Sequence, residues 1–384
     1  KPNKATPLKL KQRKLFLPFN TIFSGAYGNK NQLFLNVSNV TEIDRNQRFG
    51  VRFYKDGFSD NINNTLLKSN QKYTDFGLNH NLRSSDYNLN TYFTFTSKIN
   101  NYFGLNNNSL DTFFLRNIDP EIRRNNLKIR THWNWYNFFL RSFTFQANMA
   151  SDNFNTLEQQ LALKNKFDFD LGAGKLTGES KIFGFKTNFE SSYYEKTNLE
   201  FTQGLGAIDL FWHSNKSNLK IKIGAGASYI LGVDKISNNL VYYPQIELLY
   251  KKPGNVLLPY FKGDGGITLN TYSSLTEKNP YLAPSSNLIP SFSKYNLNVG
   301  IRSKLASVLN FDMGFIFDQI ENFNFFERLP FDNDNNLISY RLSNSFQSNY
   351  ADTNLYGIKT SIRIDLVKDN FIFFETRYNY YETQ

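Results

Sequence analysis

The chain carries few residues at the spacing that metal or acid–base chemistry requires. Its histidines, His80, His132 and His213, are far apart and follow no metal-ligand pattern. No short signature joins a histidine to a nucleophile and an orienting carboxylate, as a hydrolase needs. We therefore predict no catalytic residue, no metal and no cofactor. A barrel hydrolase with a Ser or Asp near His80 or His132 stays as an alternative.

Two glycine pairs superficially resemble phosphate-binding loops. Gly204 and Gly206 form one pair, and Gly224 and Gly226 form the other. Both lack the third glycine in register and no helical pattern follows, so the match fails its structural test. Glycine inside a strand more often relieves crowding or marks a bend, which is the interpretation that we adopt.

The remaining chemical candidates are charged residues that alternate with apolar ones. We expect them to face the interior of a barrel, and they are Lys128, Arg130, Lys164, Lys166, Asp168, Asp170, Lys220, Lys222, Arg302, Asp312, Lys359, Arg363 and Asp365. One interpretation is a solute path with an electropositive bias. The other is an interior network of ion pairs and water that fills the barrel.

Strict two-residue alternation is the dominant signal along the chain. In the segment 219–231, the odd-numbered positions from Leu219 to Leu231 are apolar, while the positions from Lys220 to Ser228 between them are charged, hydroxyl-bearing or glycine. Side chains of a strand point alternately to its two faces, so this pattern gives one face suited to lipid and one suited to water.

The alternating segments are also long. Many are about twice the length of an average globular strand of ~5–6 residues, and a tilted membrane-crossing strand needs ~9–11. We predict strands at 19–28, 31–40, 47–57, 70–83, 86–99, 123–135, 138–150, 157–171, 175–189, 197–212, 218–231, 239–250, 255–268, 294–305, 307–319, 353–366 and 370–383. This pattern predicts an all-β protein, a closed antiparallel transmembrane β-barrel of about 16–18 strands.

Composition narrows the class further. The 384 residues include 17% aromatics and no cysteine, and the net charge is +11. No apolar run approaches the ~18 residues of a transmembrane helix. A soluble β-sandwich is the alternative fold. The basic residues are spread along the strands without a nucleic-acid-binding motif, so we predict no nucleic acid partner.

Short and long connections alternate between the predicted strands. This parity is typical of barrels with short periplasmic turns and long extracellular loops. The long links 269–293 and 320–352, the second with Phe323, Phe325 and Phe326, are candidate exterior loops for recognition or for contact with lipopolysaccharide. We assign 1–18 to a periplasmic lead-in and 19–384 to the barrel, and expect a further C-terminal strand beyond Gln384.

Several segments resemble outer-membrane proteins of Bacteroidota that are related to TonB-dependent receptors. Phe19–Lys30 with Gln32–Val40 is similar to their first barrel hairpin. Glu277–Leu282, followed by the hairpin Tyr295–Phe317, is a second similarity, and the Asn, Phe, Tyr and Lys bias is a third. Such receptors carry a plug domain before the barrel, which we expect to be absent here or to lie outside this segment.

The resemblance implies a non-enzymatic protein of the cell outer membrane. We expect a subunit of a larger outer-membrane complex for uptake, protein export or barrel assembly. The alternative is a stand-alone channel, or porin, for nutrients or anionic solutes. Expected partners are outer-membrane lipid, lipopolysaccharide and other outer-membrane or periplasmic proteins.

Overall fold

The computed structural model describes residues 20–105, 118–172, 174–190, 198–214, 218–233, 239–251, 256–305, 308–331, 339–367 and 370–383. These residues form one 17-stranded sheet with two short helices. No helix in these ranges is long and apolar enough to cross a membrane. The all-β class and the strand number are therefore confirmed, whereas the predicted lead-in 1–18 lies outside the described residues.

The elements follow the predicted order closely. The strands are β1 (Thr21–Gly28), β2 (Gln32–Glu42), β3 (Gln47–Phe58), β4 (Gln71–Arg83), β5 (Tyr87–Asn101), β6 (Glu121–Trp135), β7 (Leu140–Asp152), β8 (Leu157–Asp170), β9 (Lys175–Glu190), β10 (Asn198–Ser214), β11 (Leu219–Leu231), β12 (Leu240–Tyr250), β13 (Leu257–Thr268), β14 (Ser291–Leu305), β15 (Leu309–Arg328), β16 (Phe346–Val367) and β17 (Asn370–Thr383). The helices are the 3-10 turn η1 (Asn29–Asn31) and α2 (Tyr272–Lys278).

Strands β15 and β16 extend well beyond their predicted ends. Phe323, Phe325 and Phe326, which we expected in a loop, lie inside β15, and their ladder continues to Arg328 opposite Phe346. The pairing shifts between Ile320 and Phe323, where Asn322 has a positive φ of 54°. This irregularity interrupts the alternation in the sequence, and the prediction was wrong for that reason.

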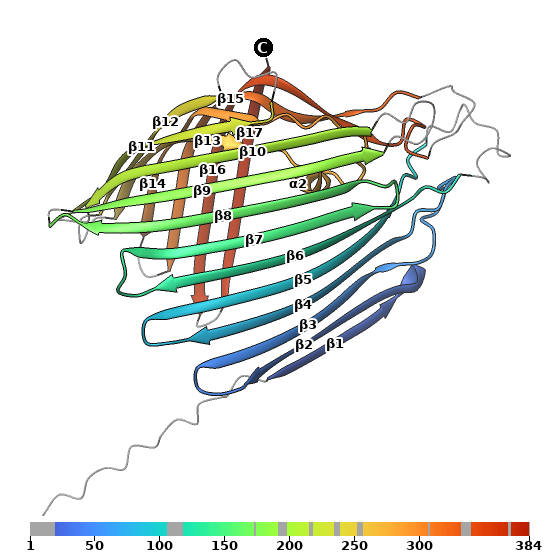
Figure 1. Ribbon diagram of the computed structural model, residues 1–384, viewed down its shortest axis with the longest axis horizontal. Helices are drawn as coiled ribbons and strands as arrows, with labels where there is room; N and C mark the ends of the chain where they lie inside the picture. The colour runs from blue at the N-terminus through green and yellow to red at the C-terminus, as the bar shows by residue number, and fades with distance from the viewer. Residues whose placement is uncertain are drawn as a thin grey trace, which may run out of the picture.

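Each strand pairs antiparallel with the strand that follows it in the chain, from β1 with β2 to β16 with β17. The result is a continuous meander that curls round on itself, with β2 to β10 on the near side of Figure 1 and β14 to β17 behind them. Because all neighbours are sequential, every ladder can form from a local hairpin.

The two ends of the meander differ. The connections that follow β2, β4, β6, β8, β10, β12, β14 and β16 are short, and we call their side the turn end. The long links 59–70, 102–120, 269–290 and 329–345 all lie at the opposite side, the loop end. All of these long links therefore lie at one end, as predicted, and Figure 1 shows them gathered at one side. Two connections at that end, 29–31 and 153–156, are as short as the turns, so the alternation is partial.

The outer face of the sheet is apolar because the ladder register aligns the alternating patterns. Leu127 of β6 lies between Phe95 of β5 and Met149 of β7. Ile223 on β11 and Phe315 on β15 are 52% and 49% exposed on this face. Large apolar side chains left in contact with the surroundings along many strands form the lipid-facing surface that a transmembrane barrel requires.

Gly226 on β11 shows why glycine occurs on the inner face of the sheet. A Cβ at Gly226 would collide with the ring of Tyr243 and with a carboxylate oxygen of Asp209. Tyr243 is opposite Gly226 in the β11–β12 ladder. The glycine therefore makes room for an inward-facing tyrosine, as we interpreted the Gly224 and Gly226 pair from the sequence.

The predicted closure of the cylinder is not confirmed. Among the described residues, β1 pairs only with β2, and β17 pairs only with β16. The 17 strands alternate in direction, so β1 and β17 run the same way. A direct seam between them would be parallel, unlike every other ladder of the sheet. Closure therefore stays a prediction.

The assignment of faces can be tested on β11. We expect Ile223→Arg to lower the free energy of unfolding in phospholipid bilayers by about 2–4 kcal/mol, because a guanidinium would be placed against the hydrocarbon. The matched control is Lys222→Arg, on the opposite face of the same strand, which we expect to leave stability unchanged. Urea titrations of the bilayer-inserted protein measure both. Equal stability of the two variants would contradict the face assignment.

Candidate functional site

The link 269–290 between β13 and β14, which we call the inner loop, folds against the concave face of the sheet. It contacts β6 through Arg124, β8 through Glu158 and β16 through Ser348. Strands β6 and β16 are far apart in the sheet, so a segment that touches both must cross the interior. Figure 1 shows α2 of this loop behind β8 and β9. Our expectation of an exterior loop was therefore wrong for residues 269–290.

Glu158 on β8 is the main polar anchor of the inner loop. Its side chain is fully buried, and its carboxylate accepts hydrogen bonds from the backbone N–H groups of Tyr272 (2.6 Å) and Ser273 (3.1 Å). The side chains of Thr187 and Gln160 donate two further bonds of 2.7 Å each. Four donors compensate the buried charge, and two of them are amides of the first turn of α2.

Arg124 on β6 forms a second anchor. Its guanidinium donates to the carbonyl oxygens of Pro280 (2.6 Å) and Leu282 (2.9 Å) and lies 5.8 Å from the centre of the Tyr272 ring. The Tyr272 hydroxyl donates to Asp152 at the end of β7, at 2.9 Å. Burial raises the pKa of Tyr272 well above its usual value, so this phenol stays neutral.

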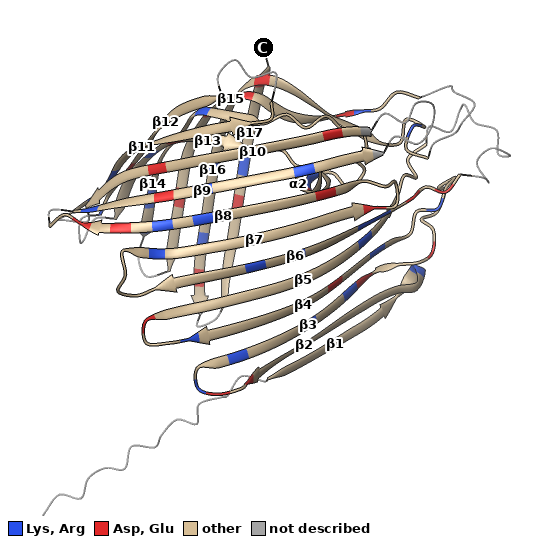
Figure 2. Ribbon diagram, in the orientation of Figure 1, with Lys and Arg blue, Asp and Glu red and all other residues tan. Residues whose placement is uncertain are grey.

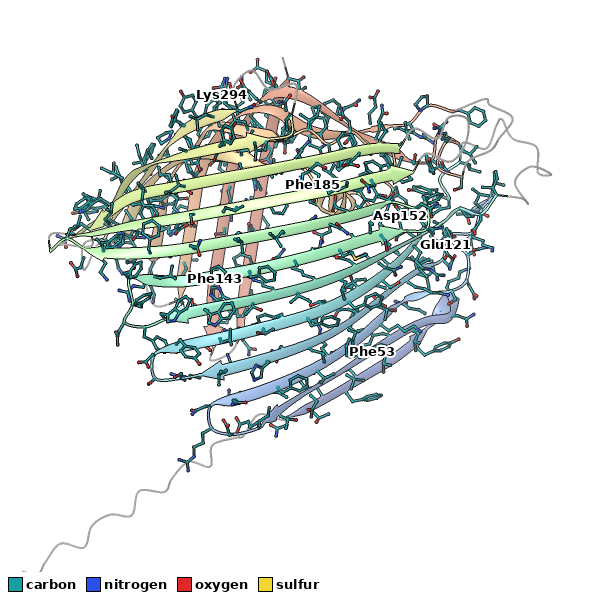
Figure 3. The ribbon with its side chains drawn as sticks, viewed as in Figure 1. Phe53, Glu121, Phe143, Asp152, Phe185 and Lys294 are labelled. Atoms are coloured by element: carbon teal, nitrogen blue, oxygen red, sulfur yellow. The ribbon has the colours of Figure 1, made fainter. Side chains whose placement is uncertain are left out.

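A cluster of apolar side chains on β9 and β10 packs against the inner loop. Phe185 and Phe189 of β9 and Leu205 of β10 pack with Tyr272 and Leu275 of α2. Leu275 is completely buried, and the rings of Phe189 and Tyr272 meet edge to face with centroids 5.2 Å apart. The inner face of β9 and β10 is thus apolar near the loop end, which the alternation pattern did not predict. Figure 3 shows Phe185 on β9 in front of the inner loop.

The opposite wall completes the attachment. The hydroxyls of Ser348 and Tyr350, both on β16, donate to the carbonyl oxygen of Asn287 at 2.6 and 3.0 Å. The amide N–H of Ala283 donates to the carbonyl oxygen of Phe346 at 2.8 Å. The inner loop is therefore fixed at both sides of the interior, with its own backbone carbonyls as the main acceptors.

Two more long links meet the inner loop at the loop end. Tyr102, from the link after β5, donates its hydroxyl to the carbonyl oxygen of Leu282 at 2.8 Å. Asn344, from the link before β16, donates to the carbonyl oxygen of Tyr102 at 2.7 Å. Tyr102, Ala283 and Tyr340 pack in one buried cluster. Three links from separate parts of the chain therefore join across this end. Figure 3 shows Glu121 of β6 and Asp152 of β7 close to each other at the same end of the sheet.

A polar basin lies on the inner wall beside α2. One cavity of about 440 Å³ lies between the inner loop and strands β4 to β6, and a second of about 370 Å³ continues along the same strands. The two share the lining residues Tyr73, Thr96, Lys98, Asn126 and Glu277. They therefore form one continuous space, which we call the basin, and its combined size is in the range of a small-molecule site.

The structure places two of the sequence-predicted residues, Lys128 and Arg130, in the wall of the basin. Antiparallel pairing sets Thr94 opposite Lys128 and Lys98 opposite Arg124. The sequence analysis missed Lys98 and Arg124. Lys98 follows a run of hydroxyl-bearing residues on β5, and its alternation with Phe93 and Phe95 was the signal that could have identified it.

Most of the other predicted residues are neutralised. Ion pairs join Lys166 to Glu179 (3.0 Å), Arg141 to Asp168 (3.3 Å), Lys220 to Glu247 (2.8 Å), Arg302 to Asp312 (2.7 Å), Lys359 to Glu375 (3.1 Å) and Arg363 to Asp365 (2.8 Å). Lys164 lies opposite Lys181, and Lys222 stacks 3.6 Å from the ring centre of Phe211. Asp170 accepts the Gly172 amide in a turn. The role of this set as a solute path stays a prediction.

The charge distribution is therefore uneven round the interior. Figure 2 shows bands of both signs close together on β8 and β9, whereas the middle of β6 carries a basic band without an acidic one. The single charged residue of β5 is Lys98, near its loop end. Within the described ranges, no group of three or more His, Cys, Asp or Glu side chains is arranged to hold a metal ion. The candidate site is therefore the basic, polar basin beside the inner loop, which hydrogen bonds attach to β6 and β16.

Comparison with known proteins identifies the fold. No protein-family model matches the chain, and no curated protein matches it either. Among solved structures, the ferric enterobactin receptor PfeA of Pseudomonas aeruginosa is similar with a TM-score of 0.65 and 11% sequence identity over 94% of this chain and 61% of that one. The chain thus spans less than two thirds of that receptor.

Two further structures agree. The siderophore receptor PirA of Pseudomonas aeruginosa has a TM-score of 0.65 at 12% identity, over 94% of this chain and 66% of that chain. The FrpB iron transporter of Neisseria meningitidis has a TM-score of 0.63 at 8% identity, over 94% and 61%. At such identities the likeness concerns the fold. With its apolar outer face, this is the barrel-like fold of outer-membrane receptors, which agrees with the predicted location in the outer membrane; closure of the barrel stays a prediction.

The Glu158 anchor generates a prediction about the inner loop. We expect Glu158→Gln to release α2 from β8, because a carboxamide has a single acceptor oxygen and presents its own N–H groups to the amides of Tyr272 and Ser273. Loss of such a buried acceptor costs about 1–3 kcal/mol, so hydrogen exchange of these two amides should accelerate roughly tenfold or more. Hydrogen-exchange mass spectrometry measures this change.

The control is Glu247→Gln, which removes a carboxylate from a more exposed ion pair with Lys220 on the far wall. It should leave exchange in the inner loop unchanged. Unaltered protection of Tyr272 and Ser273 in Glu158→Gln would show that Glu158 does not fasten the loop.

Proposed function

We propose that this protein is an outer-membrane transport barrel whose interior path is gated by the inner loop. The observation that carries the proposal is the attachment of residues 269–290 across the interior, from Arg124 on β6 to Ser348 on β16. A fully extended loop lining the wall would leave the space free, whereas this one obstructs it. Hydrogen bonds and a buried apolar cluster attach this loop, so its opening would be a local, sub-global unfolding step.

The comparisons support transport as the general activity. The similar structures include siderophore receptors, an iron transporter and a copper transporter, OprC. Within the described residues, the inner loop is the segment that enters the interior, and we propose that it obstructs the path. Its release would require the Glu158 anchor and the buried cluster around Leu275 to open together.

Crosslinking tests the gate directly, because the chain has no cysteine. The side chains of Gln160 on β8 and Ser273 on α2 are 2.7 Å apart, so Gln160→Cys with Ser273→Cys can be joined by a short bis-maleimide. We expect the joined protein to show low conductance in planar bilayers. Glu158→Gln, whose loop is released, should conduct several-fold more than the unmodified protein.

Each single-cysteine variant treated with the same reagent is a matched control. Ser273→Cys should behave as the unmodified protein, whereas Gln160→Cys, which loses a donor to Glu158, gives the baseline for the joined form. Equal conductance of the crosslinked, unmodified and loop-released forms would overturn the gate. It would leave the barrel fold unaffected.

A second candidate function is that of a subunit in a larger outer-membrane complex, for uptake, export or barrel assembly. The observation that favours it is the pair of open sheet edges at β1 and β17. An unpaired edge in hydrocarbon leaves backbone N–H and C=O groups without partners, at several kcal/mol each. Ile372 and Phe374 of β17 are more than half exposed on its outer face, beside this edge. A strand of a partner protein would satisfy both edges.

Site-specific photo-crosslinking tests this candidate in native membranes. A photoreactive residue at Ile372 should give adducts with another outer-membrane protein, because it lies on the edge strand. The same residue at Ile223, on an interior strand of the sheet, should give none. A protein that yields no adduct at either position, and that is purified alone in mild detergent, contradicts the subunit role.

A further inference from the structure

The basin differs from the rest of the interior in the state of its cations. Lys98, Lys128 and Arg130 line it, and no ion pair joins any of them to a carboxylate in the described part of the chain. Elsewhere in the described interior, many lysines and arginines lie within 2.7–3.3 Å of acidic partners, although Lys164 and Lys222 do not. A group of cations without counter-charges favours binding of an anion from solution.

Strand register produces this difference. On β6, Lys128 lies opposite Thr94 and Asn148, and Arg130 lies opposite Tyr92 and Gln146, all of them neutral. On β5, Lys98 lies opposite another cation, Arg124. On β11 and β12, by contrast, Lys222 lies opposite Glu247, which also pairs with Lys220. The positive charge of the basin therefore follows from the strand register, which places no carboxylate directly opposite Lys128 or Arg130.

The neutral part of the lining is rich in hydroxyl and amide groups. Thr94, Thr96 and Asn126 line the wall, and Ser273 and Thr276 face it from the inner loop. In addition, Asn126 Oδ1 and Arg124 Nε are buried without a hydrogen-bond partner among the described residues. Such groups satisfy a ligand that presents many hydroxyls, because buried polar atoms favour a partner.

Two aromatic rings complete the basin. Tyr73 lies on β4 with Lys98 5.7 Å from its ring centre, and Tyr92 lies on β5 beside Arg130. Flat aromatic faces next to cations suit the C–H surface of a sugar ring that also bears a negative group. A bare inorganic anion would leave these rings and the hydroxyl lining unused.

We propose that the basin binds a polyhydroxylated anion, a sugar that carries a carboxylate or a phosphate. The inference rests on the proposed function in one respect: such a solute would be the one that the inner loop admits. Lys98, Lys128 and Arg130 hold the anionic group, and the threonines with Asn126 bind the hydroxyls.

Glu277 couples this site to the gate. It is the one carboxylate among the lining residues of the basin, and it belongs to the inner loop. A bound anion places like charge near Glu277, which lines the same space. Occupation of the basin therefore disfavours the attached position of the loop.

Equilibrium binding to the full chain in detergent at low salt tests the site. The probes are digalacturonate, trehalose 6-phosphate and neutral trehalose. We expect one or both charged sugars to bind at least tenfold more tightly than trehalose, and the better of them identifies the anionic group. Lys98→Gln and Lys128→Gln should each weaken that binding about fivefold, the effect of one nearby charge in a wet site. Glu277→Gln should strengthen it.

Lys220→Gln is the matched control, because this lysine is also interior but is paired with Glu247. It should leave the affinity unchanged. The inference is overturned if neither charged sugar binds, if trehalose binds equally well, or if Lys98→Gln and Lys128→Gln behave as Lys220→Gln does. Binding is measured without transport, so a failure here is separate from a failure of the conductance experiment.

Discussion

The structure depends on one constraint: backbone N–H and C=O groups that enter hydrocarbon must be hydrogen-bonded within the protein. Seventeen antiparallel strands satisfy this requirement through sequential hairpins, and each ladder leaves one apolar and one polar face. The same constraint makes β1 and β17 the unsatisfied part of the sheet, since each has a partner on one side only. The subunit candidate follows from these edges.

The interior of the sheet is polar along most of its length, and water can fill such a space. The inner loop nevertheless enters it and buries an apolar cluster on β9 and β10. Glu158 makes this arrangement specific because its four donors, two of them backbone amides of α2, exist together only when the loop is attached. The apolar cluster and this carboxylate act together, so release of the loop must open both.

The charges divide the interior into two regions. From β8 to β17, carboxylates on the same or neighbouring strands neutralise most of the cations, so this wall has a low net charge. On β5 and β6 the partners of Lys128 and Arg130 are Thr, Asn, Tyr and Gln side chains, and the positive charge remains. The ion pairs of one sequence interpretation are therefore present on β8 to β17, whereas an electropositive solute path along β6 stays a prediction.

The sequence by itself determined the strands, their two faces and the partial alternation of short and long connections, because a period of two is a local property of the chain. It identified Lys128 and Arg130 for the same reason. Only the tertiary structure decided that residues 269–290 turn inward, that Phe323 continues β15 and that Lys98 and Arg124 join the basin. These outcomes depend on register and on contacts between distant segments, such as Arg124 with Leu282, which no local pattern encodes.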